Sequence, residues 1–165
     1  MLCRMPDVQL RADLIRHFRL GKRSIHGPAH WQRVQAHAER LALAAGGDVA
    51  VARHFAWFHD AERLDEWYDL GHGARAAALV RAWRDRLPLS DAQVDLLARA
   101  CERHELGEVS DDPTVGACWD ADRLELTRVG LQPDPRYMST VAGQVAARPG
   151  TGQHRRSGVT DTDPT

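Results

Sequence analysis

Helical periodicity runs through almost the whole of this chain and constrains its fold more than any other feature. Apolar residues recur at intervals of three and four, and no segment shows a convincing alternation of apolar and polar residues. The predicted helices cover residues 8–18, 28–46, 49–60, 73–86, 90–101 and 113–130, with a short seventh opening at Pro135. Pro28 and the capping residues Asp48 and Ser90 mark helix starts, and Gly46 marks a stop. This pattern predicts an all-α, single-domain bundle of about six to seven helices.

The chain has 165 residues, a length that suits one domain better than two. We expect the helical domain to extend over residues 1–147. From residue 148 onward Gly, Thr, Ser, Asp and Pro replace almost all apolar residues. This composition cannot build a packed core and predicts a disordered C-terminal tail over residues 148–165.

Charge and cysteine content narrow the functional classes. The 22 basic and 23 acidic residues leave no positive excess of the kind that proteins use to hold nucleic-acid polymers. No stretch approaches the roughly 18 apolar residues of a membrane helix, and residues 1–6 lack the apolar run of a secretory signal. The three cysteines form no CxxC pair, which argues against a disulfide framework and a thiolate zinc site. We expect a cytoplasmic protein without membrane or nucleic-acid partners.

The dipeptide His59-Asp60 directly follows the apolar run Phe55–Phe58. A histidine and a carboxylate at the end of a buried helix both lose hydration and both need partners. A divalent metal ion satisfies the two groups together, because neutral imidazole and carboxylate are both good metal ligands. Structural hydrogen bonding is the alternative reading of this pair.

Five further side chains fall at helix ends or inside apolar helices. His30 lies in the first turn of the predicted second helix, His72 opens the fourth and His104 ends the fifth. Asp120 and Asp122 interrupt the otherwise apolar sixth helix. Each has an ordinary explanation, since histidines are common at helix ends and the helix dipole favours acidic residues in a first turn.

Taken together, the segments His26–Val34, Phe58–Asp60 and Asp120–Leu124 resemble the motifs of the HD-domain metal-dependent phosphohydrolase superfamily, over roughly residues 24–130. The resemblance implies that His30, His59, Asp60 and Asp122 form a single-metal site. Asp122 is preferred to Asp120 because the family's last ligand stands in an Ala-Asp-x-Leu setting. The two aspartates also lie about 200° apart around a helix and cannot easily share one ion.

Some branches of this superfamily hold a second metal ion with two further histidines, while the aspartate of the His-Asp pair bridges the ions. His72 and His104 occupy the corresponding places in the order, so Asp60, His72 and His104 are candidate catalytic residues as well as ligands. Alternatively, the two histidines contact the substrate phosphate or donate protons. His26 either shares that part or caps the turn before Pro28.

The resemblance implies a divalent ion (Mn, Ni, Co, Zn or Fe; one, or two if the second site is used) that assists hydrolysis of a phosphate ester or anhydride. Such an ion activates water, and nearby cations stabilise the charge that builds on the phosphoryl oxygens. Arg33, Arg63 and Arg123 are candidates because each lies close in sequence to an expected ligand. Alternatively, Arg33 or Arg123 pairs with Asp120 or another buried acid.

One position departs from the family pattern. Nucleotidase and alarmone-hydrolase branches carry a glutamate three residues after the His-Asp pair, where this chain has Arg63, with Glu62 one place earlier. Those two activities are therefore not carried over. Glu62 or Asp65 is a candidate general base, and Trp67 and Tyr68 on the same loop are placed to touch a substrate.

A small phosphorylated molecule, with nucleotides first by the breadth of the family, is the expected partner. A di-iron oxygenase using His72 and His104 is the alternative enzyme, and a metal-binding regulatory module the alternative without catalysis. The sequence leaves the oligomeric state open, a homo-oligomer included. His37 and His54 are expected on helix surfaces without partners.

Overall fold

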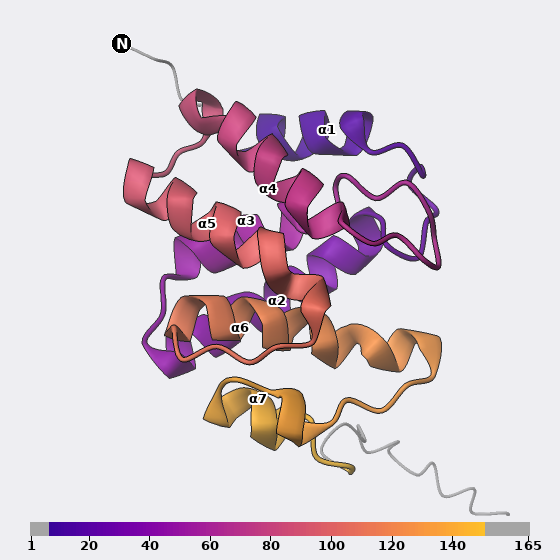
Figure 1. The fold of residues 1–165 in the computed structure, drawn as a ribbon, viewed down its shortest axis with the longest axis vertical. Helices are drawn as coiled ribbons and strands as arrows, with labels where there is room; N and C mark the ends of the chain where they lie inside the picture. Colours follow the sequence, from indigo (N-terminus) through magenta and orange to yellow (C-terminus); the bar gives the residue numbers. More distant parts are fainter. Residues whose placement is uncertain (1–6, 151–165) are drawn as a thin grey trace, which may run out of the picture.

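Every regular element within residues 7–150, the part of the chain that the computed structural model describes, is a helix. The α-helices are α1 (Asp7–His17), α2 (Pro28–Ala45), α3 (Val49–Phe58), α4 (His72–Ala82), α5 (Asp91–Arg103), α6 (Pro113–Leu124) and α7 (Val141–Ala146) (Figure 1). The predicted all-α fold class is confirmed. No helix within this range is long and apolar enough to cross a membrane. Residues 1–6 of the predicted domain and 151–165 of the predicted tail lie outside the described residues.

The helices begin and end where the sequence supplies capping groups. The Asp48 carboxylate accepts hydrogen bonds from two backbone N–H groups in the first turn of α3. Ser90 and Gln93 form a reciprocal capping box at α5, and Asp112 caps α6 as Asp48 caps α3. α2 ends at Gly46, whose φ of 73° is the left-handed conformation that glycine adopts without strain. These local signals explain why most helix starts are readable from the sequence.

The apolar core fixes how the helices meet. α2 packs against both α3 and α6, while α4 packs along α5 (Figure 1). Trp31, Leu41, Phe55, Phe58 and Leu97 are completely buried between them. Burial of each such side chain stabilises the fold by about 1.5–3 kcal/mol. The same packing brings the polar ends of α2, α3 and α6 toward one another.

Three predicted helix boundaries are corrected by the structure. The fourth helix ends at Ala82, and the 3₁₀ turn η1 (Arg84–Arg86) continues it. The sixth ends at Leu124 and passes into η3 (Glu125–Val129). Pro135 opens only the single 3₁₀ turn η4 (Pro135–Tyr137), so that α7 begins at Val141, later than expected.

The start of α7 is set by Asp120, which is completely buried in α6. Its carboxylate accepts hydrogen bonds from the backbone N–H groups of Ser139 and Thr140, at 2.7 and 2.8 Å, and from the Thr140 hydroxyl. A Cβ atom at Gly143 would lie 2.2 Å from Asp120 Oδ2, so this helix can approach only with glycine there. Asp120 therefore holds α7 against the bundle, and no sequence signal had linked it to that helix.

Candidate metal centre

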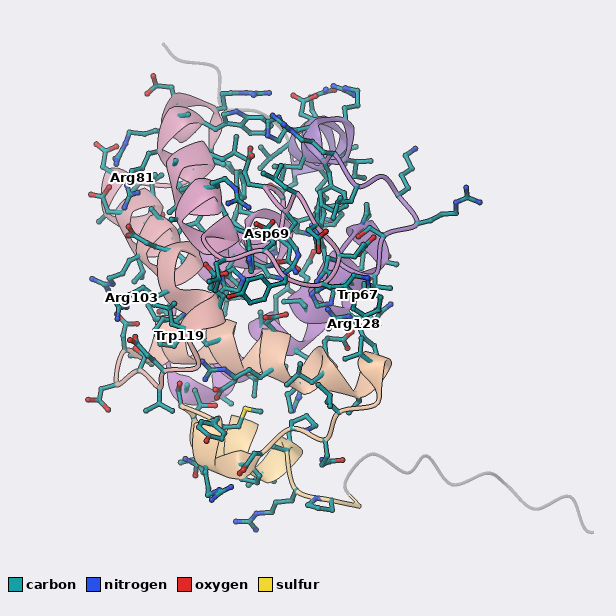
Figure 2. The ribbon with its side chains drawn as sticks, turned by 45° about the vertical axis from the view of Figure 1, so that its right-hand side comes forward. Trp67, Asp69, Arg81, Arg103, Trp119 and Arg128 are labelled. Carbon is teal, nitrogen blue, oxygen red and sulfur yellow. The ribbon has the colours of Figure 1, made fainter. Side chains whose placement is uncertain are left out.

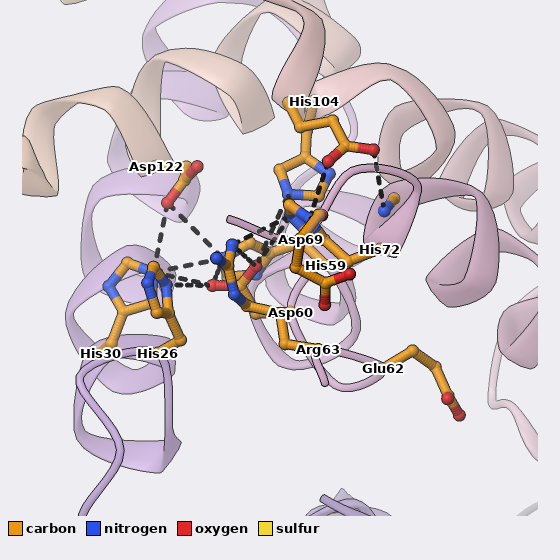
Figure 3. Close-up of polar contacts among 12 residues, drawn as sticks. His26, His30, His59, Asp60, Glu62, Arg63, Asp69, His72, His104 and Asp122 are labelled. Atoms are coloured by element: carbon orange, nitrogen blue, oxygen red, sulfur yellow. Dashed lines mark hydrogen bonds and ion pairs between the residues drawn. The ribbon is translucent and has the colours of Figure 1, made fainter. Parts of the chain in front are cut away.

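Four side chains predicted as ligands converge at one place, although they come from three separate parts of the chain (Figure 3). His30 lies in the first turn of α2, His59 and Asp60 directly follow α3, and Asp122 lies near the end of α6. His30 Nε2 is 3.2 Å from both His59 Nε2 and Asp122 Oδ1. Asp60 Oδ2 lies 3.4 Å from His59 Nε2 and 3.6 Å from His30 Nε2. Ligand atoms about 2.1 Å from one ion stand roughly 3.0–3.4 Å apart, so this group has the spacing of a metal site.

The other carboxylate oxygen of Asp60 faces a second group, which we call the second half-site: Asp60 Oδ1, His72 Nε2 and His104 Nε2. The two imidazole nitrogens are 3.0 Å apart. Asp60 Oδ1 lies 3.2 Å from the nitrogen of His72 and 3.7 Å from that of His104. Asp60 thus stands between both groups, in the position expected of a bridging carboxylate.

Glycine at position 73 allows the second half-site to form. His72 is the first residue of α4 and His104 directly follows α5, so the two helix ends must approach closely. A Cβ atom on Gly73 would lie 2.7 Å from the carbonyl oxygen of Cys101 and 3.2 Å from His104 Nδ1. The Glu105 carboxylate accepts a hydrogen bond from the Gly71 N–H at the start of α4.

Hydrogen bonds on the far side of the rings fix which nitrogen faces inward. The Nδ1–H groups of His59, His72 and His104 donate to the backbone carbonyls of residues 56, 69 and 101. In a neutral ring the Nε2 atom then carries a lone pair. The facing Nε2 lone pairs of His72 and His104, 3.0 Å apart, repel each other unless a cation lies between them. The donor set and its outer hydrogen bonds therefore suit a divalent metal ion.

Glu125 lies beside His30, and the sequence did not single it out. His30 Nδ1 is buried without a hydrogen bond and lies 3.7 Å from Glu125 Oε2. Burial alone would raise the pKa of Glu125, but the adjacent side chains of His30, His37 and Arg33 hold that pKa well below its usual range. The available signal was spacing, because Glu125 follows Asp122 by three residues and therefore lies on nearly the same helix face.

Charge within the cluster is strongly coupled. Burial alone would lower the pKa of His59, but Asp60 and Asp122 raise it to about 10. Burial alone would raise the pKa values of the Asp60 and Asp122 carboxyl groups, but the neighbouring imidazoles keep these pKa values well below the usual range. Without a cation the carboxylates thus hold a proton on His59, and a metal ion would supply that positive charge instead.

A cavity of about 200 Å³ opens beside Asp60. Its lining residues are His26, Asp60, Arg63, His72, His104, Glu105, Asp122, Leu126 and Arg128. His26 Nδ1 lies 3.0 Å from Asp60 Oδ2, and its Nε2–H donates to the carbonyl of Glu66. Arg128 donates to the backbone carbonyls of Ile25 and Glu125, and its third nitrogen lies 3.2 Å from His26 Nδ1. The cavity therefore has a cationic wall beside the candidate ligands.

The remaining candidate cations and bases lie elsewhere within residues 7–150. Arg33 pairs with Glu125 at 2.6 Å, and Arg123 donates to the carbonyls of Tyr137 and Glu108, so neither lines the cavity. Glu62 points away from the cluster and pairs with His17 (Figure 3).

Acidic side chains within the loop between α3 and α4 bind the backbone of the same loop. The Asp65 carboxylate accepts hydrogen bonds from the backbone N–H groups of Trp67 and Tyr68. Both aromatic side chains are exposed, and Trp67 lies on the same side of the molecule as Arg128 (Figure 2).

Two histidines expected on the surface without partners were assigned wrongly. His54 is buried and its Nδ1–H donates to the Ala50 carbonyl at 2.7 Å. His37 Nε2 lies 3.5 Å from Glu125 Oε1. The partner of His54 is a backbone carbonyl and that of His37 lies on another helix, and the apolar pattern of the sequence marks neither.

No family model matches the chain, and no curated protein matches it either. Among solved structures, it is similar to one described as a predicted HD superfamily hydrolase from an uncultured Thermotogales bacterium. The match has a TM-score of 0.68 and 21% sequence identity, and covers 86% of this chain and 83% of the other. The fold of this chain is therefore all-α and HD-domain-like, as the motifs indicated.

Proposed function

We propose that this protein is a metal-dependent phosphohydrolase that cleaves a phosphate ester or anhydride. The observation that carries the proposal is the convergence of His30, His59, Asp60 and Asp122: the Nε2 atoms of the two histidines lie 3.2–3.6 Å from each other and from an oxygen of each carboxylate. The likeness to a predicted HD superfamily hydrolase supports the same class of reaction. When bound, a divalent ion would lower the pKa of a bound water molecule and polarise a phosphoryl oxygen.

The chain's own residues then divide the remaining tasks. His30 and His59 would be ligands; the Ala56 carbonyl fixes the orientation of His59, and the Glu125 carboxylate lies 3.7 Å from His30 Nδ1. Asp60, held also by His26, orients the two half-sites relative to each other. The guanidinium groups of Arg63 and Arg128 line the cavity, where they would bind phosphoryl oxygens and stabilise the charge that builds there.

The cavity volume bears on the substrate. Ligand pockets for drug-sized molecules span about 300–1,000 Å³, so a cavity of about 200 Å³ suits the reacting phosphoryl end of a substrate better than a whole nucleotide. The remainder would lie along the loop that carries Trp67 and Tyr68, whose exposed rings suit stacking against a base. Nucleotides are accordingly the substrate class we propose first.

A metal and substrate screen tests this function. Protein stripped with a chelator is reloaded with Mn, Ni, Co, Zn or Fe and assayed for phosphate release from nucleoside mono-, di- and triphosphates. We expect activity with at least one ion, and loss of both bound metal and activity in His59→Ala and Asp60→Ala. His17→Ala, a histidine outside the cluster, serves as the matched control and should retain both.

Circular dichroism establishes that each variant keeps its helical content. Undiminished turnover in folded His59→Ala or Asp60→Ala would refute the proposal.

The second half-site keeps a di-iron oxygenase as a second candidate, since it offers Asp60, His72 and His104 to another ion. Two irons per chain with a mixed-valent electron paramagnetic resonance signal would favour that activity over hydrolysis.

A further inference from the structure

Arg63 is the one arginine that is buried among residues 7–150, and it lies against the second half-site. Its NH1 atom is 3.3 Å from His72 Nε2 and 3.7 Å from Asp60 Oδ1. Its Nε–H donates to the Asp65 carbonyl, which ties the side chain to its own loop. A guanidinium group remains charged at every physiological pH, so this is a permanent cation beside a candidate cation site.

The half-site needs such a donor. The Nδ1–H groups of His72 and His104 are both directed to backbone carbonyls, so in the neutral rings the Nε2 lone pairs face inward. Arg63 NH1 can donate to the Nε2 atom of His72 while lying close to the carboxylate of Asp60. Both are interactions that a second metal ion would otherwise make with the same atoms.

The charges next to the second half-site also favour a single ion. Asp60 and Asp122 together match one divalent ion at the first group of ligands. Glu105 Oε2 lies 2.7 Å from His72 Nδ1 and adds one negative charge behind the second half-site. Arg63 matches that charge, whereas a second divalent ion would face the guanidinium at close range and be repelled.

We infer that the Arg63 guanidinium is a built-in cation that takes the place of a second metal ion, so that this chain holds one ion and not two. The inference rests on the proposed function for the first ion. Arg63 also has N–H groups that it does not use in these contacts, and these would be directed at the substrate in the cavity. The number of bound metal ions is then set by one side chain, Arg63, in the loop after α3.

Metal content measures this directly. After loading with Mn²⁺ and dialysis, elemental analysis of the wild-type protein should give about one ion per chain. Arg63→Met, which keeps most of the apolar stem and removes the charge, should give about two. Arg63→Lys keeps a positive charge and should stay at one. Arg128→Ala is the matched control, because it removes the other arginine of the cavity and should also stay at one.

Two further readouts locate the additional ion. The double variant Arg63→Met with His72→Ala should return to one ion per chain. Two Mn²⁺ ions that share the Asp60 carboxylate should show an exchange-coupled electron paramagnetic resonance spectrum in Arg63→Met, absent from the wild type. Thermal unfolding checks that each variant is folded, and Arg63→Gln replaces Arg63→Met if the latter is not.

The outcomes separate this inference from the proposed function. Two ions in the wild type, or one ion in folded Arg63→Met and Arg63→Gln, would overturn the inference and leave a metal-dependent hydrolase intact. Two ions in Arg63→Lys would show that side-chain shape, not charge, excludes the second ion, and would overturn it as well. A wild-type protein that binds no divalent ion would refute the proposed function itself.

Discussion

Replacing Gly73 by alanine should destabilise this protein, although the same exchange stabilises most helices. In an ordinary helix alanine is favoured over glycine by about 0.5–1 kcal/mol. Here the new Cβ atom would stand 2.7 Å from the Cys101 carbonyl oxygen and 3.0 Å from that of Glu102. Both obstacles are backbone atoms, so no rotamer change relieves them. Overpacking of this kind costs about 1–3 kcal/mol, which exceeds the gain in propensity.

The size of the effect follows from the displacement. Restoring an ordinary contact of 3.4 Å from 2.7 Å requires α4 and α5 to separate by roughly 0.7 Å at this point. We expect a net loss of about 0.5–2 kcal/mol, or roughly 1–8 °C in Tm for a chain of this length. Metal–ligand distances tolerate only about 0.2 Å, so Gly73→Ala should also remove the second ion from Arg63→Met.

Urea denaturation followed by circular dichroism measures the change in the free energy of unfolding. The matched control is Ala74→Gly, one residue further along α4, at an exposed position. There the exchange runs in the ordinary direction, and the glycine variant should be less stable by about 0.5–1 kcal/mol. A Gly73→Ala protein that unfolds at the same urea concentration as the wild type, or a higher one, would refute the close-approach argument.

Three further predictions concern the ion, pH and the last helix. A divalent ion at 100 times its Kd should stabilise the protein by about 2.7 kcal/mol, raising Tm by roughly 5–11 °C, and Asp122→Ala should show no such rise in a thermal melt. The metal-free protein should lose stability as pH rises from about 6.5 to about 10, because the folded-state pKa of His59 is raised to about 10 by Asp60 and Asp122. Urea titrations in chelator across that range check this, and a flat profile would contradict it. Asp120→Ala should cost about 1–3 kcal/mol, because the buried Thr140 N–H and hydroxyl lose their acceptor. Faster proteolysis within α7 at unchanged metal content is the expected readout, and an unaltered cleavage rate would count against it.

Local signals made the fold readable from the sequence. Caps such as Asp48, Ser90 and Asp112 lie within three residues of the groups that they satisfy, so the chain itself displays them. The start of α7 was not readable in this way. It depends on Asp120, some twenty residues earlier in the chain, and only the packed structure brings that carboxylate to Thr140.

The candidate ligands were predictable for a related reason. His59 and Asp60 stand out because charged groups after a buried apolar run need partners, and the order of the motifs supplied His30 and Asp122. The supporting groups carry no such mark. Glu105 and Glu125 resemble ordinary surface acids in the sequence, and Arg63 could not be distinguished from Arg33 until the burial of each was known.

Metal binding by the candidate ligands would also have a kinetic consequence. His30 comes from the second helix and Asp122 from the sixth, so the binding geometry exists only after most of the chain has assembled around its core. An ion that cannot bind the folding transition state cannot accelerate folding. It would slow unfolding instead, so that metal binding lengthens the lifetime of the folded protein without changing its rate of folding.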